Sequence, residues 1–498
     1  MSFVPDAAQR CDTYALDPQV GFKSQYLIAP EGAMSMPGMT ELVINKWSLM
    51  HGETVHPVRL IDAKQRVFGA FFGTGVARDG IMDGQASFAG FNSKGRSFEA
   101  DLEDYVNGIA GRFILILDSG TKTRIYRDPM GHMPLFYNGK EGIAGSSIYL
   151  CIDRPVTANI ACARPGETMM STVAVFPMGQ TSDVDVQLMP GNHVLDLADF
   201  TAHRGWPLRN TIRKVTAAKS KPVIEKMAKR LRHIVQGWIA AEDVVLPLDA
   251  GVGSRILLAA AGDQRSALSQ ICVLQPGGPQ DATNLAVAQS LAEAIGQPLQ
   301  VLTRQMALDT FDQSRDTRQE RKRLFWLRTS SALRVPATTA WGIDGLYAAQ
   351  HVLLIPAGLT ALQGGWTMGA PAPKPLRNTL ASEIAATIGD RPEKAVRKAI
   401  EPDYGRWKSG LPKTLQAQVD DFIRIELHET ARAVTSLGLA DHVPASPFSD
   451  REFIELALKL PLGLRGSEAF AEALIRALDP RLVGLPYDAQ IPNSTAAE

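Results

Sequence analysis

The chain has 498 residues, which is long for one hydrophobic core, so its length predicts two domains. A hydrophobic content of 45% and a charged content of 21% are those of a soluble globular protein and exclude a disordered or fibrous chain. The 52 Lys and Arg residues balance the 52 Asp and Glu residues, so no overall field draws the chain to nucleic acid or to an anionic membrane.

The cysteines and the N-terminus indicate the compartment. Cys11, Cys151, Cys162 and Cys272 lie far apart without the spacing of a zinc site, which indicates reduced, buried thiols. Residues 1–12 contain an early acid and no apolar segment of a signal peptide, and no stretch approaches the roughly 18 apolar residues of a membrane span. We therefore expect a cytoplasmic protein with neither a nucleic acid nor a membrane as its partner.

The first part of the chain predicts an α+β domain of layered antiparallel sheets with helices. Residues 1–55 have weak periodicity, but residues 58–138 contain short β runs separated by Gly, Asp and Lys turns. Residues 97–110 predict a helix, because Ser97 precedes acidic first turns and glycines mark the end.

A change of pattern near residue 190 predicts the domain boundary. Pro, Gly and Trp interrupt the chain there, and we assign residues 1–200 to the first domain and residues 205–498 to the second. The second domain begins with alternating helices and strands, expected at residues 223–242, 244–248, 254–262, 267–274, 281–296 and 298–303. This alternation predicts an α/β doubly wound parallel sheet with ligands at the carboxyl ends of its strands. From about residue 305 onward the sequence predicts a mostly helical part with one further strand, at residues 351–358.

A small-residue turn follows the predicted strand at residues 244–248 and opens the next helix. Backbone N–H groups and the positive end of a helix dipole make such a turn an anion site. The candidate nucleotide- or anion-binding residues are Asp249, Ala250, Gly251, Val252, Gly253, Ser254, Arg255 and, in the next strand, Val273. Arg255 has two interpretations: its guanidinium contacts a phosphate or carboxylate, or it forms an ion pair with Asp249.

The turn resembles the PP-loop of ATP pyrophosphatases, which in asparagine synthetases reads Ser-Gly-Gly-x-Asp-Ser; Gly251 and Ser254 match. Other segments resemble the same family in the same order. They are the Asp-x-x-Gly-x-x-Pro-Leu pattern of Asp128, Gly131, Pro134 and Leu135, the hairpin at 189–197, the helix and strand at 281–302, and the Pro-Phe-x-Asp segment within 445–461. The chain thus resembles the asparagine synthetase and β-lactam synthetase superfamily. The resemblance implies an Ntn-type glutamine amidotransferase-like domain, a PP-loop domain, and ATP and Mg²⁺ as cofactors.

The sequence departs from this family where the family has its catalytic groups. Ser2 stands in place of the N-terminal Cys nucleophile, and Cys11 is expected to be a bystander. Gly253 replaces the PP-loop Asp, and Asp249 replaces the first Ser, which sets a carboxylate against phosphate. Alignment on the Gly-Gly-Trp at 364–366 places Thr360 and Ala361 at the positions of a second acidic pair. Glu472 stands at the position of a catalytic Lys four residues before Arg476. Lys459 either substitutes for that Lys or is a solvated or snorkelling side chain of its helix.

Two functions remain open on these observations. In the first, the chain is a catalytically degenerate scaffold or binding protein that holds a small metabolite, a peptide or a catalytically competent homologue, as a homo- or hetero-oligomer. In the second, it is an ATP-dependent amide-forming synthetase that adenylates a carboxylate without glutaminase activity. The basic run at residues 318–328 suggests single-stranded nucleic acid, but an amphipathic helix with a solvated face is the simpler interpretation.

Overall fold

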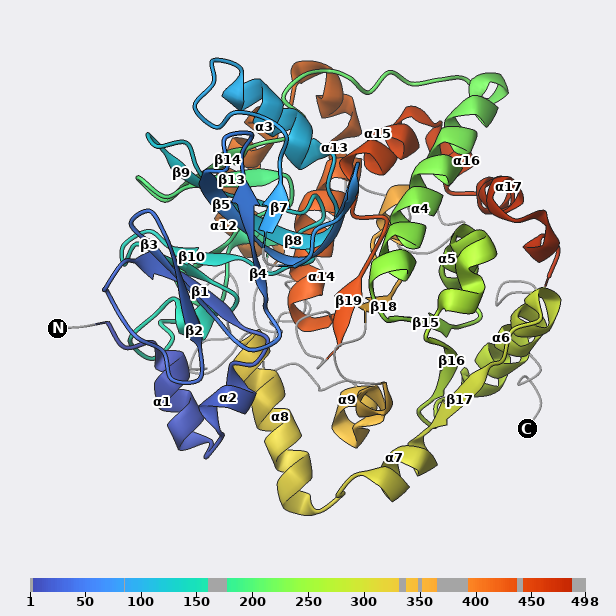
Figure 1. The fold of residues 1–498 in the computed structure, drawn as a ribbon, viewed down its shortest axis with the longest axis horizontal. Coiled ribbons are helices and arrows are strands. Elements are labelled where there is room, and N and C mark those ends of the chain that lie inside the picture. The colour runs from blue at the N-terminus through green and yellow to red at the C-terminus, as the bar shows by residue number, and fades with distance from the viewer. Residues whose placement is uncertain are drawn as a thin grey trace.

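The structure is a computed structural model of the chain. It describes residues 3–84, 86–159, 177–330, 337–347, 352–364, 393–436 and 442–485. Four residues of the sequence analysis, Ser2, Cys162, Gly365 and Trp366, lie outside the described residues. Figure 1 shows the two antiparallel sheets on the N-terminal side of the molecule and the parallel sheet on the other side.

Two sheets of mainly antiparallel strands form the first part. The first has the order β12 (Gln187–Leu188), β10 (Phe136–Asn138), β11 (Ile143–Gly145), β1 (Tyr26–Pro30), β3 (Trp47–His51) and β2 (Thr40–Ile44). The second has the order β14 (Thr201–Arg204), β13 (His193–Asp196), β9 (Thr123–Arg127), β8 (Ala110–Asp118), β5 (Val67–Ala77), β4 (Pro57–Ile61) and β7 (Ala86–Phe88), and β6 (Gly80–Ile81) pairs with β5. The predicted layers are confirmed, but β1 to β3 lie where the periodicity was weak.

The facing sides of these sheets enclose one hydrophobic core. Alternate residues of each strand point to the same side of a sheet. Tyr26 and Ile28 of β1 therefore meet Phe72 of β5, and the Tyr26 and Phe72 rings stack with centroids 6.0 Å apart. On the outer side of the second sheet, α3 (Phe98–Asn107) buries Phe98 and Leu102. This helix is the one expected at residues 97–110.

The second part contains the predicted parallel sheet. Its order is β17 (Gln300–Thr303), β16 (Gln270–Gln275), β15 (Val244–Leu248), β18 (Val352–Leu354) and β19 (Val443–Ala445), with parallel neighbours throughout. The connecting helices are α4 (Lys221–Ala241), α5 (Val252–Ala261) and α6 (Asp281–Ile295). The predicted helices and strands in this region are confirmed. The short strand β19 was not expected, because it has three residues with Pro444 in the middle and therefore no readable period.

Helices make up most of the described chain after β17. They are α7 (Arg304–Thr310), α8 (Arg315–Thr329), α9 (Ala337–Trp341), α10 (Leu359–Gln363), α12 (Glu393–Ser409), α13 (Val419–Phe422), α14 (Glu429–Ser436), α15 (Arg451–Lys459), α16 (Leu462–Arg465) and α17 (Glu468–Leu478). Two more, α1 (Asp6–Thr13) and α2 (Pro18–Gly21), precede β1. Among the described residues, no helix is long and apolar enough to cross a membrane.

The two parts of the chain share packed surfaces. The basic run forms α8, which buries Phe325 and Leu327, and Leu327 belongs to the cluster that also contains Cys11 of α1. An amphipathic helix is therefore confirmed for this run. Arg230 of α4 forms a buried ion pair with Asp450 at 2.7 Å, and it also donates to the Gly108 carbonyl. The two parts are thus in contact with each other. The division into domains at residues 200 and 205 stays a prediction.

Candidate functional site

The small-residue turn lies at the centre of the parallel sheet. It connects β15 to α5, and the neighbours of β15 are β16 on one side and β18 on the other. Strand order reverses at β15, which makes its carboxyl end the usual ligand position in an open α/β sheet. The turn is thus where the sequence placed a ligand site.

The Asp249 carboxylate occupies two donors of this turn. Its Oδ1 accepts a hydrogen bond from the Gly251 N–H at 3.0 Å and one from the Ser254 hydroxyl at 2.6 Å. The Ala250 N–H donates to the Asn284 side chain of α6 at 3.0 Å. A phosphate bound at this turn would compete for these donors. The turn therefore already holds an anionic group, and that group belongs to the chain itself.

Pro356 fills the space beside Gly253. A Cβ atom on Gly253 would lie 2.4 Å from Pro356 Cβ and 2.9 Å from its Cγ. Atoms this close overlap, and a proline ring has little freedom to move. The carboxylate that the family carries at this position therefore has no room in this structure.

The second acidic position is also without acids. Thr360 and Ala361 lie on α10, where Thr360 is exposed and Ala361 is buried. Mg²⁺ prefers carboxylates and phosphate oxygens, so a threonine hydroxyl is a weak ligand for it. A buried alanine side chain has no ligand atom. Among the described residues, no group of three His, Cys, Asp or Glu side chains is arranged to hold a metal ion. The residues at these positions do not fit a Mg²⁺–ATP complex.

Arg255 is turned away from the turn. Its side chain is buried, and its Nη1 donates to the Leu485 carbonyl at 2.5 Å. Within the described part of the chain no ion pair joins Arg255 to Asp249, so the predicted alternative of such a pair is wrong. Glu472 of α17 lines a cavity of about 10 Å³ with Arg255, which is room for about one water molecule.

Two further candidates are engaged in the framework. Val273 is fully buried in β16, where it is paired with Leu248 and Val301, so its side chain has no access to a ligand. Lys459 donates to Glu455 at 2.6 Å one turn earlier on α15, so its ammonium group is already paired with a carboxylate of its own helix.

In the first part of the chain, Asp128 of the Asp-x-x-Gly-x-x-Pro-Leu pattern stabilises the loop that follows it by hydrogen bonds. Asp128 accepts from the His132 and Met133 N–H groups at 2.8 and 3.0 Å and from the Ser449 hydroxyl at 3.0 Å. Cys11 donates to the Leu16 carbonyl, and burial raises the pKa of its thiol to about 11. A thiol with this pKa is a poor nucleophile, as expected for a bystander.

Comparison with known proteins gave distant structural likenesses. No family model and no curated protein match the sequence. An NH3-dependent NAD synthetase from Campylobacter jejuni is 16% identical with a TM-score of 0.19, covering 41% of this chain and 93% of its own. A glutamine phosphoribosylpyrophosphate amidotransferase from B. subtilis is 10% identical with a TM-score of 0.22, covering 78% and 77%. These scores are too low to carry an argument, so the function must be argued from the residues of this chain.

The structure also contains a cavity that the sequence did not predict. It has a volume of about 340 Å³ and is lined by β10, by the segment from Met178 to Arg204, and by the end of α12. Those segments are far apart in the chain, and although one of them includes the hairpin at 189–197, none contains a residue that the sequence analysis named as a site candidate. The available signal in the sequence is the pair of histidines at positions 193 and 203.

Proposed function

We propose that this chain is an asparagine synthetase-like protein that does not adenylate a carboxylate and that acts as a scaffold or binding protein. One observation carries the proposal: the Asp249 carboxylate accepts hydrogen bonds from Gly251 and Ser254, two of the donors that a nucleotide phosphate would use. Pro356, packed against Gly253, supports it independently, because a metal-binding carboxylate cannot be accommodated there.

The electrostatic cost of a phosphate at this turn can be bounded. Two unit charges 4 Å apart interact by about 1 kcal/mol in bulk water and by about 4 kcal/mol at an effective dielectric of 20. Asp249 is exposed, so its repulsion lies between these limits. That range corresponds to a weakening of phosphate binding by about 5-fold to 1,000-fold. A Mg²⁺ ion between the two would offset the repulsion, but the candidate carboxylates for it are absent.

The framework between the two parts supports a scaffold role. The Arg451 side chain is buried and donates to the carbonyls of Arg127 and Val106 in the first part. Glu426 accepts a bidentate pair of hydrogen bonds from Arg204 at 2.5 and 2.8 Å. These contacts hold the sheets in their arrangement, and none of them requires a catalytic group.

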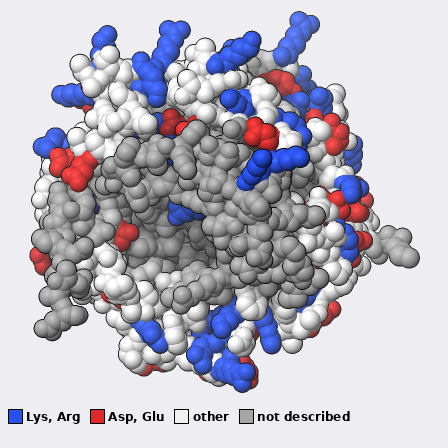
Figure 2. All heavy atoms as spheres, turned by 180° about the vertical axis from the view of Figure 1, so that it is seen from behind, with Lys and Arg blue, Asp and Glu red and all other residues white. Residues whose placement is uncertain are grey.

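On the face drawn in Figure 2, basic and acidic side chains are interspersed over the described surface.

ATP–pyrophosphate exchange tests this proposal. Full-length protein is incubated with ATP, Mg²⁺, labelled pyrophosphate and a panel of carboxylates that includes aspartate and other amino acids, and label in ATP is measured. We expect no exchange above a reaction without protein. Exchange that depends on a carboxylate would establish the other function, a synthetase with a rearranged site, and would overturn the scaffold proposal.

A further inference from the structure

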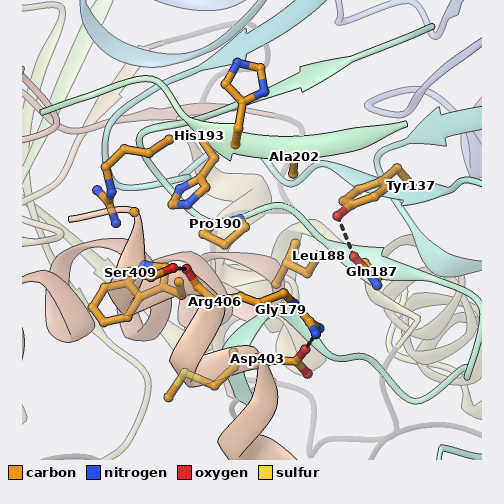
Figure 3. A pocket seen from close by; sticks show the side chains of 15 residues that line it. Tyr137, Gly179, Gln187, Leu188, Pro190, His193, Ala202, Asp403, Arg406 and Ser409 are labelled. Carbon is orange, nitrogen blue, oxygen red and sulfur yellow. Dashed lines mark hydrogen bonds and ion pairs between the residues drawn. The ribbon is translucent and has the colours of Figure 1, made fainter. Parts of the chain in front are cut away.

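The cavity of about 340 Å³ has the size of a small-molecule site and lies where three segments meet. Figure 3 shows side chains of β10, of the 178–204 segment and of α12 facing one space. The polar and aromatic lining residues include Tyr137, Gln187, His193, Asp403, Arg406 and Trp407. Sites between parts of a chain are a common place for ligands.

The cations that line this cavity are each paired with a carboxylate. Arg204 is buried and shares two hydrogen bonds with Glu426, which also accepts from the Trp407 indole N–H at 2.9 Å. Arg406 donates to Asp403. A charged ligand would meet cations that already have a carboxylate partner. It would lose its hydration on entering the cavity and would gain no counter-ion there. The cavity therefore favours an uncharged occupant.

The cavity also presents hydrogen-bonding groups with capacity to spare. The His193 Nδ1 lies 2.8 Å from the Gly191 carbonyl, which can only accept, so Nδ1 carries the proton and Nε2 is an acceptor. Burial lowers the pKa of His193 to about 3, which keeps the ring neutral at ordinary pH. The Gln187 Oε1 accepts from the Tyr137 hydroxyl at 2.5 Å, so the two N–H donors of its amide remain available.

An acceptor and several donors beside an apolar wall match hydroxyl groups, which donate and accept at once. The wall consists of Leu188, Pro190 and Ala202 with the Trp407 ring. A ring with hydrogen-bearing carbons on one face would pack against it. We propose that this cavity binds a small uncharged molecule with several hydroxyl groups and one apolar face, the chemistry of a neutral sugar. The site is separate from the turn at 249–254 and goes beyond the scaffold function.

Saturation-transfer NMR on the full-length protein tests this inference with three probe mixtures. One contains glucose, galactose and mannose, the second indole and benzamide, and the third benzoate and phenyl phosphate. We expect transfer to the sugar mixture. The inference is overturned if the sugars give no signal, or if only the aromatic or the charged mixture binds in the cavity.

Two neighbouring substitutions on β14 locate the binding. Ala202→Phe places a ring into the cavity, whereas Thr201→Phe places the same ring on the opposite, exposed face of the strand. We expect the sugar signal to be lost in the first variant and kept in the second. A signal that persists in Ala202→Phe would contradict the assignment. Gln187→Leu is a second test in case Ala202→Phe fails to fold. Gln187 is exposed, and loss of its amide donors should weaken the sugar signal.

The outcome is independent of the proposed function. Carboxylate-dependent pyrophosphate exchange would refute the scaffold proposal and leave sugar binding at the cavity untouched. Loss of sugar binding would refute the cavity assignment without restoring an adenylation site.

Discussion

Replacement of Asp249 should convert the turn into a usable anion site. Asp249→Asn removes the negative charge but retains an oxygen that accepts from Gly251 and Ser254. Asp249→Ser removes the charge and also frees both donors. The pair of variants therefore separates charge repulsion from occupation of the donors.

The expected magnitude follows from the geometry. Loss of one exposed charge about 4 Å from a phosphate should strengthen binding by about 1–4 kcal/mol, or about 5-fold to 1,000-fold. Asp249→Ser should bind more tightly than Asp249→Asn, since each freed donor adds about 1 kcal/mol. Inorganic pyrophosphate is the suitable probe, because it needs no adenine pocket.

Thermal unfolding with increasing pyrophosphate measures this effect. At 100 times the dissociation constant a ligand stabilises the folded state by about 2.7 kcal/mol, which is a measurable increase of the midpoint temperature. We expect the increase in midpoint temperature to be largest for Asp249→Ser, smaller for Asp249→Asn and smallest for the wild type. The reasoning is refuted if the three proteins respond equally, or if the wild type responds most.

Three other changes have defined outcomes. Gly253→Asp should destabilise the fold by about 1–3 kcal/mol through overlap with Pro356 and should not create Mg²⁺ binding, as measured by thermal unfolding and calorimetry. Glu426→Gln should cost about 3–5 kcal/mol, because it leaves the buried Arg204 without its counter-charge. Burial lowers the pKa of His132 from 6.5 to about 4, so its contribution to stability is complete above pH 6.5 and is lost as the pH falls towards 4. His132→Phe should therefore reduce the loss of stability between pH 7.5 and pH 5.0 by about 2 kcal/mol, seen in the midpoint temperatures at the two pH values.

Controls for these changes are available in the same chain. Asp104→Asn breaks an exposed ion pair with Arg78 and should cost less than about 1 kcal/mol. A similar cost for Glu426→Gln would contradict the buried-pair argument. For Gly253→Asp, a second substitution Pro356→Gly should recover part of the lost stability. Both His132 ring nitrogens are buried without a partner among the described residues, so His132→Phe should not itself destabilise the fold.

Much of the parallel sheet could be predicted because its signals are local. The apolar run at 244–248 forms β15 with those bounds, and the helix expected at 281–296 is found at Asp281–Ile295. The hairpin of β2 and β3 was missed although a signal was present. Asn45 adopts a φ of +54° in its two-residue turn, and Asn is one of the few residues that tolerate this conformation.

The candidate site could be predicted in place but not in detail. Sequence reasoning identified the turn and the repulsive Asp249, since both follow from residues next to one another. It could not foresee that Pro356, more than one hundred residues later, fills the space beside Gly253. Nor could it foresee the cavity lined by Tyr137, His193 and Trp407, because only tertiary packing brings those segments together.

Calorimetric titration of the wild-type protein with ATP and Mg²⁺ tests the central claim most directly. The claim is that the turn at residues 249–254 already holds the Asp249 carboxylate and is closed to a nucleotide phosphate. We predict no saturable heat up to millimolar nucleotide. Saturable micromolar binding that Ser254→Ala weakens, with unchanged binding by a distant surface variant such as Asp104→Asn, would contradict it.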